Sequence, residues 1–62
     1  MNTFDKITFL ENNLKKLPIT DFDMHNVAET FISRGGWNDS KSFETAYQDC
    51  LCYMAVRLVN KH

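Results

Sequence analysis

Residues 18–37, PITDFDMHNVAETFISRGGW, decide the fold, because they contain signals for both ends of a helix. Thr20 and Asp23 resemble a capping box in which Asp replaces the usual Glu. Ile19 and Met24 occupy the positions of a hydrophobic staple, which fixes the angle at which a chain enters a helix. These signals predict that a helix begins directly after Thr20.

The same stretch also contains a stop signal. Gly35 and Gly36 can supply the left-handed residue that ends many helices, and Trp37 follows where its ring can fold back over Ile32. We therefore predict a helix over residues 21–34 and place Trp37 in the core. The apolar face of this helix consists of residues spaced three and four apart: Met24, Val27, Ala28, Phe31 and Ile32.

A first helix is predicted upstream, over residues 4–17. Thr3 can cap it, and Asp5 in its first turn is favoured by the helix dipole. Pro18 disfavours helical geometry at the residue before it, so this helix ends near Leu17. Its apolar residues again recur at spacings of three and four: Ile7, Leu10, Leu14 and Leu17.

A third and longest helix is predicted over residues 40–60, with possible caps at residues 38–40 (Asn, Asp and Ser). No segment alternates between apolar and polar residues at period two, so no strand is expected. The chain is therefore predicted to be all-α, with residues 1–62 forming a single three-helix domain. The main apolar stripe of the third helix is Phe43, Tyr47, Cys50, Leu51, Met54 and Leu58.

The third helix carries a second apolar stripe. At 100° per residue, Cys52, Val56 and Val59 fall opposite the main stripe, with Ala55 beside them. Helices that are apolar all round are normally buried on every side, and three helices are too few to cover both stripes. We predict that this stripe, with added contacts from Tyr53, binds a partner, which is either a second copy of the chain in a homodimer or another protein. The alternative is that a few small apolar side chains are simply exposed.

Charge is unevenly distributed along the chain, although its net value is only -1. The segment 21–49 holds six acidic and two basic residues, which give it a net charge of -4. A solvated surface is the ordinary interpretation, and the alternative is a face that docks on a basic surface of another protein. The acidic residues that would form this partner-binding face are Asp21, Asp23, Glu29, Asp39, Glu44 and Asp49.

No catalytic, metal-binding or cofactor-binding residue is predicted. His25 lies close in sequence to Asp21 and Asp23, but residues two apart diverge on a helix and do not chelate a metal ion together. Cys50 and Cys52 have no neighbouring base in sequence that would activate a thiolate. The only glycine pair does not match a phosphate-binding loop.

The expected location is the cytoplasm. A single residue separates the two cysteines, so on a helix their side chains point apart and cannot form a disulfide with each other. We therefore expect both to be reduced thiols in a reducing compartment. The first 14 residues carry charges and lack the continuous apolar stretch of a signal peptide. The longest uncharged apolar run, residues 50–56, is too short to span a bilayer, so no membrane contact is predicted.

These features favour a small non-enzymatic interaction module that acts on another protein in a regulatory or inhibitory role. One hypothesis is that it is an inhibitor, encoded by a phage or mobile element, of a host enzyme that handles nucleic acid. The alternative is a helix-turn-helix-like DNA-binding regulator. Binding to nucleic acid is disfavoured because the link over residues 34–40 is longer than usual and the following helix carries Glu44 and Asp49.

Overall fold

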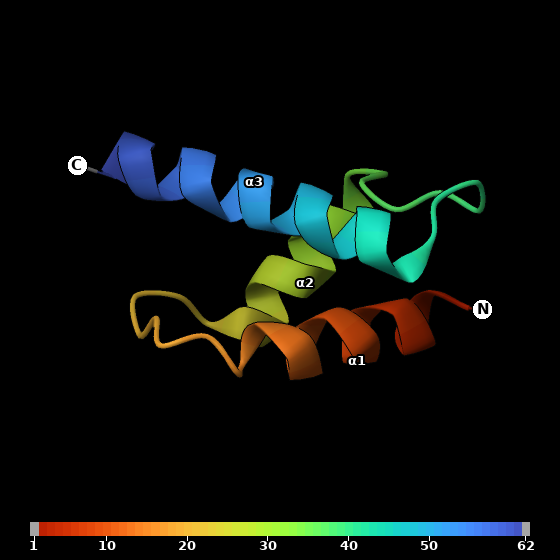
Figure 1. Ribbon diagram of the computed structural model, residues 1–62, viewed down its shortest axis with the longest axis horizontal. Coiled ribbons are helices and arrows are strands. Elements are labelled where there is room, and N and C mark those ends of the chain that lie inside the picture. The colour runs from red at the N-terminus through yellow and green to blue at the C-terminus, as the bar shows by residue number, and fades with distance from the viewer. Residues whose placement is uncertain (1, 62) are drawn as a thin grey trace.

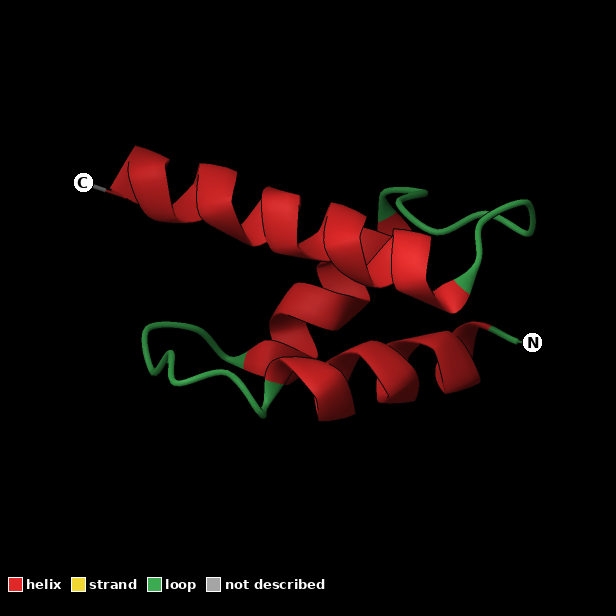
Figure 2. Cartoon of the chain, in the orientation of Figure 1, coloured by secondary structure: helices red, strands yellow, loops and turns green. Residues whose placement is uncertain are grey.

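Three helices form the fold of the chain, and the computed structural model describes residues 2–61 (Figure 1). The helices are α1 (Thr3–Leu14), α2 (Met24–Ser33) and α3 (Phe43–Lys61). Over the described residues the remaining chain is loop and turn, without a strand (Figure 2). The predicted all-α class with three helices is therefore confirmed.

The two longer helices lie along the long axis of the molecule and α2 crosses obliquely between them (Figure 1). The described part of the chain measures 34 × 18 × 18 Å. Because α2 packs against both α1 and α3, the core lies where the three helices meet. The last turns of α3 extend beyond this region, at the same end of the molecule as the loop that joins α1 to α2 (Figure 1).

The ends of α1 differ slightly from the prediction. The helix is capped by Asn2 rather than Thr3, because the Asp5 backbone N–H donates to the Asn2 side-chain oxygen over 2.8 Å. It ends at Leu14, three residues before the predicted end. Leu17 instead lies in a tight turn, where its N–H donates to the Leu14 carbonyl over 3.0 Å.

The predicted capping box at the start of α2 is wrong. Asp23 is the cap, and its carboxylate accepts a hydrogen bond from the Asn26 N–H over 3.2 Å. A carboxylate is a stronger acceptor than a hydroxyl at the positive end of a helix, so the cap forms at Asp23 and not at Thr20. Asp21 consequently lies in the loop before α2 rather than in its first turn.

The end of α2 follows the predicted glycine signal. Gly35 has a φ of +79°, and its N–H donates to the Ile32 carbonyl over 2.9 Å. The Gly36 N–H donates to the Phe31 carbonyl over 3.0 Å, which completes a Schellman motif. A Cβ atom at Gly36 would lie 2.5 Å from the Phe31 ring, so the close approach of this ring requires glycine there.

The start of α3 lies three residues later than predicted. Ser42 acts as its cap, because its hydroxyl oxygen accepts a hydrogen bond from the Thr45 N–H over 3.2 Å. The predicted caps at residues 38–40 are wrong. Asn38 instead stabilises the preceding loop, where its side-chain oxygen accepts a hydrogen bond from the Ser40 N–H over 3.0 Å.

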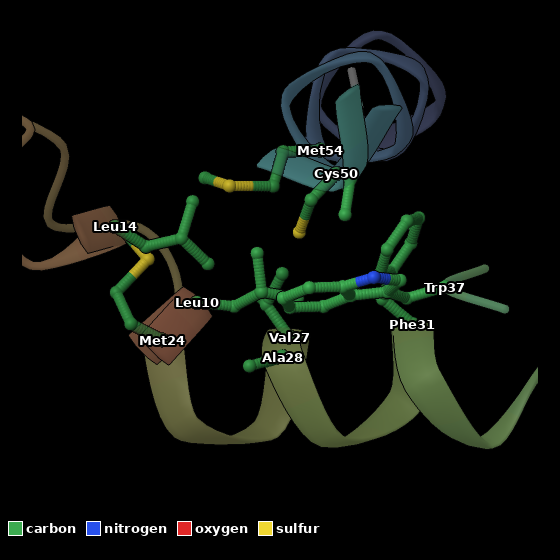
Figure 3. Packing of buried hydrophobic residues seen from close by; sticks show 10 residues of the cluster. Leu10, Leu14, Met24, Val27, Ala28, Phe31, Trp37, Cys50 and Met54 are labelled. Atoms are coloured by element: carbon green, nitrogen blue, oxygen red, sulfur yellow. The ribbon is translucent and has the colours of Figure 1, made fainter. Parts of the chain in front are cut away.

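Trp37 is buried in the core, as predicted, with only 6% of its surface exposed (Figure 3). Its ring centroid lies 5.8 Å from that of Phe9 and 5.3 Å from that of Phe43, in edge-to-face arrangements. Its Nε1–H donates to the Lys41 carbonyl over 3.1 Å, so its polar atom is satisfied. The buried core comprises Leu10, Leu14, Met24, Val27, Ala28, Phe31, Trp37, Ala46, Cys50 and Met54.

The predicted core stripe of α3 is only partly correct. Its fully covered residues are Ala46, Cys50 and Met54, and Ala46 was not among those predicted. Leu51 and Leu58 are only half-buried. The core face of the helix is therefore rotated toward Ala46, whose small side chain allows a close approach to the rest of the core, and one edge of the predicted stripe reaches the surface.

Candidate interaction surface

The second apolar stripe of α3 is uncovered. Val56 is 59% exposed and Val59 is 73% exposed, and Cys52 on the same side of the helix is exposed as well. Neither α1 nor α2 reaches this side, because both pack on the opposite side of α3, around Cys50. Binding of a partner by these residues stays a prediction.

The apolar surface is wider than the predicted stripe, because Ala55 lines two hollows at once. The first has a volume of about 250 Å³ and lies on the outer side of α3 against Val56 and Val59. The second, of about 140 Å³, is a groove between α3 and the loop before α2, where Ile19 and Phe22 form the opposite wall. We call the exposed and half-exposed apolar side of α3 the C-terminal apolar surface: Leu51, Cys52, Ala55, Val56, Leu58 and Val59.

Tyr53 lies outside the C-terminal apolar surface. Its ring packs against Phe31 of α2, with 5.8 Å between the ring centroids. The guanidinium groups of Arg34 and Arg57 lie 5.9 Å and 5.6 Å from the centroid of the Tyr53 ring. Arg57 also donates a hydrogen bond to the tyrosine hydroxyl over 2.8 Å. Tyr53 thus joins α3 to α2, and its contact with a partner stays a prediction.

Two of the six predicted acidic residues form ion pairs with lysines. Lys6 of α1 lies 3.1 Å from Asp39, and Lys41 lies 2.7 Å from Asp49. The ammonium group of Lys41 also donates to the Gly36 carbonyl over 2.8 Å. Part of the negative charge of segment 21–49 is therefore neutralised by ion pairs in the folded chain.

The other acidic residues lie in different places. Asp23 caps α2 through Asn26 and lines a third hollow of about 550 Å³, together with Asp21 and Arg57. Glu44 lies in the first turn of α3, where the helix dipole favours a carboxylate. Within residues 2–60, neither Asp21 nor Glu44 forms a hydrogen bond or an ion pair. Binding of a partner by these six residues stays a prediction.

His25 joins α1 to α2 through an ion pair that the sequence did not predict. Its Nδ1 lies 2.7 Å from a carboxylate oxygen of Glu11, and its Nε2 lies 3.6 Å from Glu29. The hydrogen bond to Glu11 raises the pKa of His25 above its usual value of 6.5. Lys15, at 2.7 Å, and then His25 lower the pKa of Glu11. Among the described residues, no three His, Cys, Asp or Glu side chains are grouped to hold a metal ion.

We expect the stability of the fold to depend on this ion pair. Because the folded pKa of His25 is raised, its contribution is present below about pH 6.5 and is lost as the pH rises through the folded pKa. Because the pKa of Glu11 is lowered, the contribution of the carboxylate is present above about pH 4.5 and is lost as the pH falls through its folded pKa. The melting temperature should therefore be slightly higher near pH 6 than near pH 8, and the change is small because His25 is exposed to solvent.

Thermal unfolding followed by circular dichroism at the two pH values measures this difference. His25→Gln should remove most of the difference, whereas Asn12→Gln, an exposed change on α1, should preserve it. An unchanged pH dependence in His25→Gln would show that other groups cause it.

The two thiols have different environments. Cys50 is buried, and burial raises the pKa of its thiol to about 11. It is therefore protonated at neutral pH and a poor nucleophile. Cys52 is exposed on the C-terminal apolar surface, and the two cysteines are not bonded to each other.

In the part of the chain that the structure describes, no helix combines the length and the apolar character needed to cross a membrane. The cytoplasmic location stays a prediction. Comparisons of the chain with protein-family models, with curated proteins and with solved structures found no match.

Proposed function

We propose that this protein is a non-enzymatic interaction module, regulatory or inhibitory in role, that binds another protein chain through the C-terminal apolar surface. The partner chain that we propose first is a second copy of the same protein, which gives a homodimer. The observation that carries the proposal is the exposure of Val56 and Val59, by 59% and 73%, beside two apolar hollows that meet at Ala55. A contiguous apolar surface of this kind typically marks a site of protein–protein contact.

The two valines alone supply only part of the association energy. Complete burial of a valine is worth roughly 1.5 kcal/mol or more. With the exposed fractions of Val56 and Val59, the four valines of a symmetric dimer contribute roughly 4 kcal/mol. Association itself costs an estimated 4–15 kcal/mol in lost freedom of motion. The groove edge of the surface, with Leu51 and Leu58, must therefore also be covered in the complex.

A further protein with a basic surface, such as an enzyme that handles nucleic acid, would meet mostly carboxylates that already have a partner within the chain. Asp39 and Asp49 are paired with lysines, Asp23 caps a helix, and Glu29 lies near His25. The acidic residues most available to such a partner are Asp21 and Glu44.

The DNA-binding alternative receives less support. Nine residues separate α2 from α3, whereas the turn of a helix-turn-helix usually has three or four. Lys41, the basic residue just before α3, is 2.7 Å from Asp49 and is thus already neutralised. Phosphate contacts require accessible positive charge, which the start of α3 lacks, because Glu44 is also there.

The test of the proposal is Val56→Asp. Because it places a carboxylate in the proposed contact, we expect it to weaken self-association by at least about tenfold, the effect of 1.4 kcal/mol. Sedimentation or light scattering at tens of micromolar should show a dimer for the wild type and a monomer for the variant. Val56 is 59% exposed, so the variant should keep its helical circular dichroism.

Thr8→Asp is the matched control, because it adds the same charge at an exposed position on α1, away from the C-terminal apolar surface. It should leave the dimer intact. If Thr8→Asp dissociates the protein as strongly as Val56→Asp, net charge and not the surface governs association. If the wild type is monomeric and Val56→Asp changes neither its mass nor its binding to any chain, the proposed function is wrong.

A further inference from the structure

Two arginines converge on the ring of one tyrosine. The guanidinium groups of Arg34, the residue that follows α2, and of Arg57 on α3 lie 5.9 Å and 5.6 Å from the centroid of the Tyr53 ring. We propose that these three side chains form a binding site for a phosphate monoester group. The site lies outside the C-terminal apolar surface, so it does not depend on the homodimer.

The positive charges of this cluster have no counter-charge within the described chain. Lys6, Lys15 and Lys41 each lie between 2.7 and 3.1 Å from a carboxylate oxygen. Neither Arg34 nor Arg57 forms an ion pair with a described residue. Two like charges beside one ring repel each other, and a bound anion with two negative charges would neutralise both.

The hydrogen-bonding groups of the cluster have donors to spare. Arg57 donates to the Tyr53 hydroxyl over 2.8 Å, so the hydroxyl oxygen accepts one bond and its own hydrogen can be donated to a ligand. The remaining N–H groups of Arg57, and the guanidinium of Arg34, have no acceptor among the described residues. Because a guanidinium group has no acceptor atom of its own, a matching ligand must supply acceptors, as an oxyanion does.

Part of the site is held in place before a ligand arrives. The half-buried Tyr53 ring packs on the buried Phe31 ring, with 5.8 Å between the centroids. The hydrogen bond to this tyrosine holds Arg57, which lies one helical turn further along α3. Donors that are already positioned lose less side-chain entropy when they bind an anion. Arg34 is exposed at the end of α2, and its long side chain can turn toward an anion held at the hydroxyl.

Charge and the number of acceptors favour a phosphate monoester over other oxyanions. A monoester has three acceptor oxygens and a charge of about −1.5 to −2 near neutral pH. It can therefore pair with both guanidinium groups and also accept the hydroxyl hydrogen. A carboxylate or a phosphodiester carries a single negative charge, which leaves one of the two arginines unmatched.

Neighbouring carboxylates limit the affinity of the site. Asp49 lies one helical turn before the tyrosine, although Lys41 pairs with it at 2.7 Å. Asp21 and Asp23 line the hollow that Arg57 also borders. These negative charges oppose an anion, and salt screens the attraction of exposed arginines. We expect a dissociation constant in the millimolar range for a small phosphate monoester.

The test is a titration of the wild type with methyl phosphate, followed by NMR at the arginine Nε–H signals. We expect the signals of Arg34 and Arg57 to shift and to saturate. Arg34→Gln and Arg57→Gln should each weaken binding by about fivefold or more, because each removes one charged contact. Dimethyl phosphate, a singly charged diester, should also bind about fivefold more weakly or worse. Equal affinity for the two esters would overturn the proposal and favour a site for phosphodiesters.

Two further variants separate a specific site from general attraction of anions. Lys16→Gln removes a positive charge that is likewise exposed and without an ion pair among the described residues, but lies after α1. It should change the affinity for methyl phosphate by less than about twofold. Tyr53→Phe keeps the ring on Phe31 and removes only the hydroxyl, so it should weaken binding while the helical circular dichroism is retained. A loss in Lys16→Gln as large as in the arginine variants would overturn the proposal.

The phosphate group can belong to a small ester or to a phosphorylated protein chain, and peptides distinguish the two. If a phosphorylated chain is the ligand, some members of a phosphoserine peptide library should bind about tenfold more tightly than methyl phosphate, because neighbouring residues add contacts. If none does, the ligand is a small phosphate ester. The absence of a saturating shift at either arginine with tens of millimolar methyl phosphate would overturn the site, and it would leave the proposed function, which concerns another surface, unaffected.

Discussion

Replacing Trp37 with alanine is expected to lower the free energy of unfolding by about 3–5 kcal/mol, the usual effect of removing a large buried aromatic side chain. Trp37 is 6% exposed, and its ring packs edge-to-face on Phe9 and Phe43. The Lys6 ammonium group lies 5.7 Å from the centroid of the same ring. The substitution thus removes contacts to α1 and α3 at once.

A loss of this size is comparable to the total stability of the domain. At roughly 0.05–0.15 kcal/mol per residue, a 62-residue chain is stable by roughly 3–9 kcal/mol. Trp37→Ala should therefore be largely unfolded, or unfold at a much lower urea concentration, as followed by far-ultraviolet circular dichroism. Trp37→Phe is the control, because it keeps an aromatic ring and loses the hydrogen bond to Lys41, so it should lose much less stability. Equal midpoints for Trp37→Ala and the wild type would contradict a stabilising role for this buried ring.

The periodicity of the sequence was sufficient to predict the three helices but not where each one starts. The spacing of apolar residues indicates which face of a helix is buried, and this pattern extends over several turns. A single residue that departs from the pattern therefore does not change the predicted helix. A cap depends on a single hydrogen bond, and several residues near each start could form it. Asp23 forms it instead of Thr20, and Ser42 forms it instead of Asn38 or its two neighbours.

The candidate surface was also predicted only in part. The stripe of Cys52, Val56 and Val59 follows from helical geometry alone and is exposed in the structure. The groove edge was not predicted, because Leu51 and Leu58 were assigned to the core. Their partial exposure depends on how the other helices lie against α3, which is a tertiary property.

The distribution of charged residues along the sequence did not predict which charges lie close together in the folded chain. Lys6 and Asp39 are 33 residues apart and yet pair at 3.1 Å. His25 and Glu11 are 14 residues apart and pair at 2.7 Å across two helices. The net charge of a segment contains no information about such pairs, since they depend on which helices pack together. Asp39 and Asp49 are therefore paired with lysines in the fold, and the docking of the acidic residues on a partner stays a prediction.

Replacing Leu14 with alanine should have the second largest effect, a loss of about 2.7–5 kcal/mol. Leu14 is completely buried and projects from α1 into the space between the three helices (Figure 3). The substitution leaves a cavity there, and each 1 kcal/mol shifts the melting temperature of a small domain by about 4–8 °C. We expect the melting temperature to fall by more than about 10 °C. Asn12→Ala, at an exposed position of the same helix, should change it little.

Leu14→Ala also provides a sensitive test of self-association, because a dimer of folded chains stabilises the folded state by mass action. A partner at 100 times its dissociation constant adds about 2.7 kcal/mol, enough to offset much of the cavity. The melting temperature of Leu14→Ala should therefore rise by several degrees when the protein concentration is raised about a hundredfold. The double variant Leu14→Ala/Val56→Asp should melt at the same temperature at both concentrations, because the carboxylate on the C-terminal apolar surface prevents pairing. A rise that persists in the double variant would place the dimer contact on another surface.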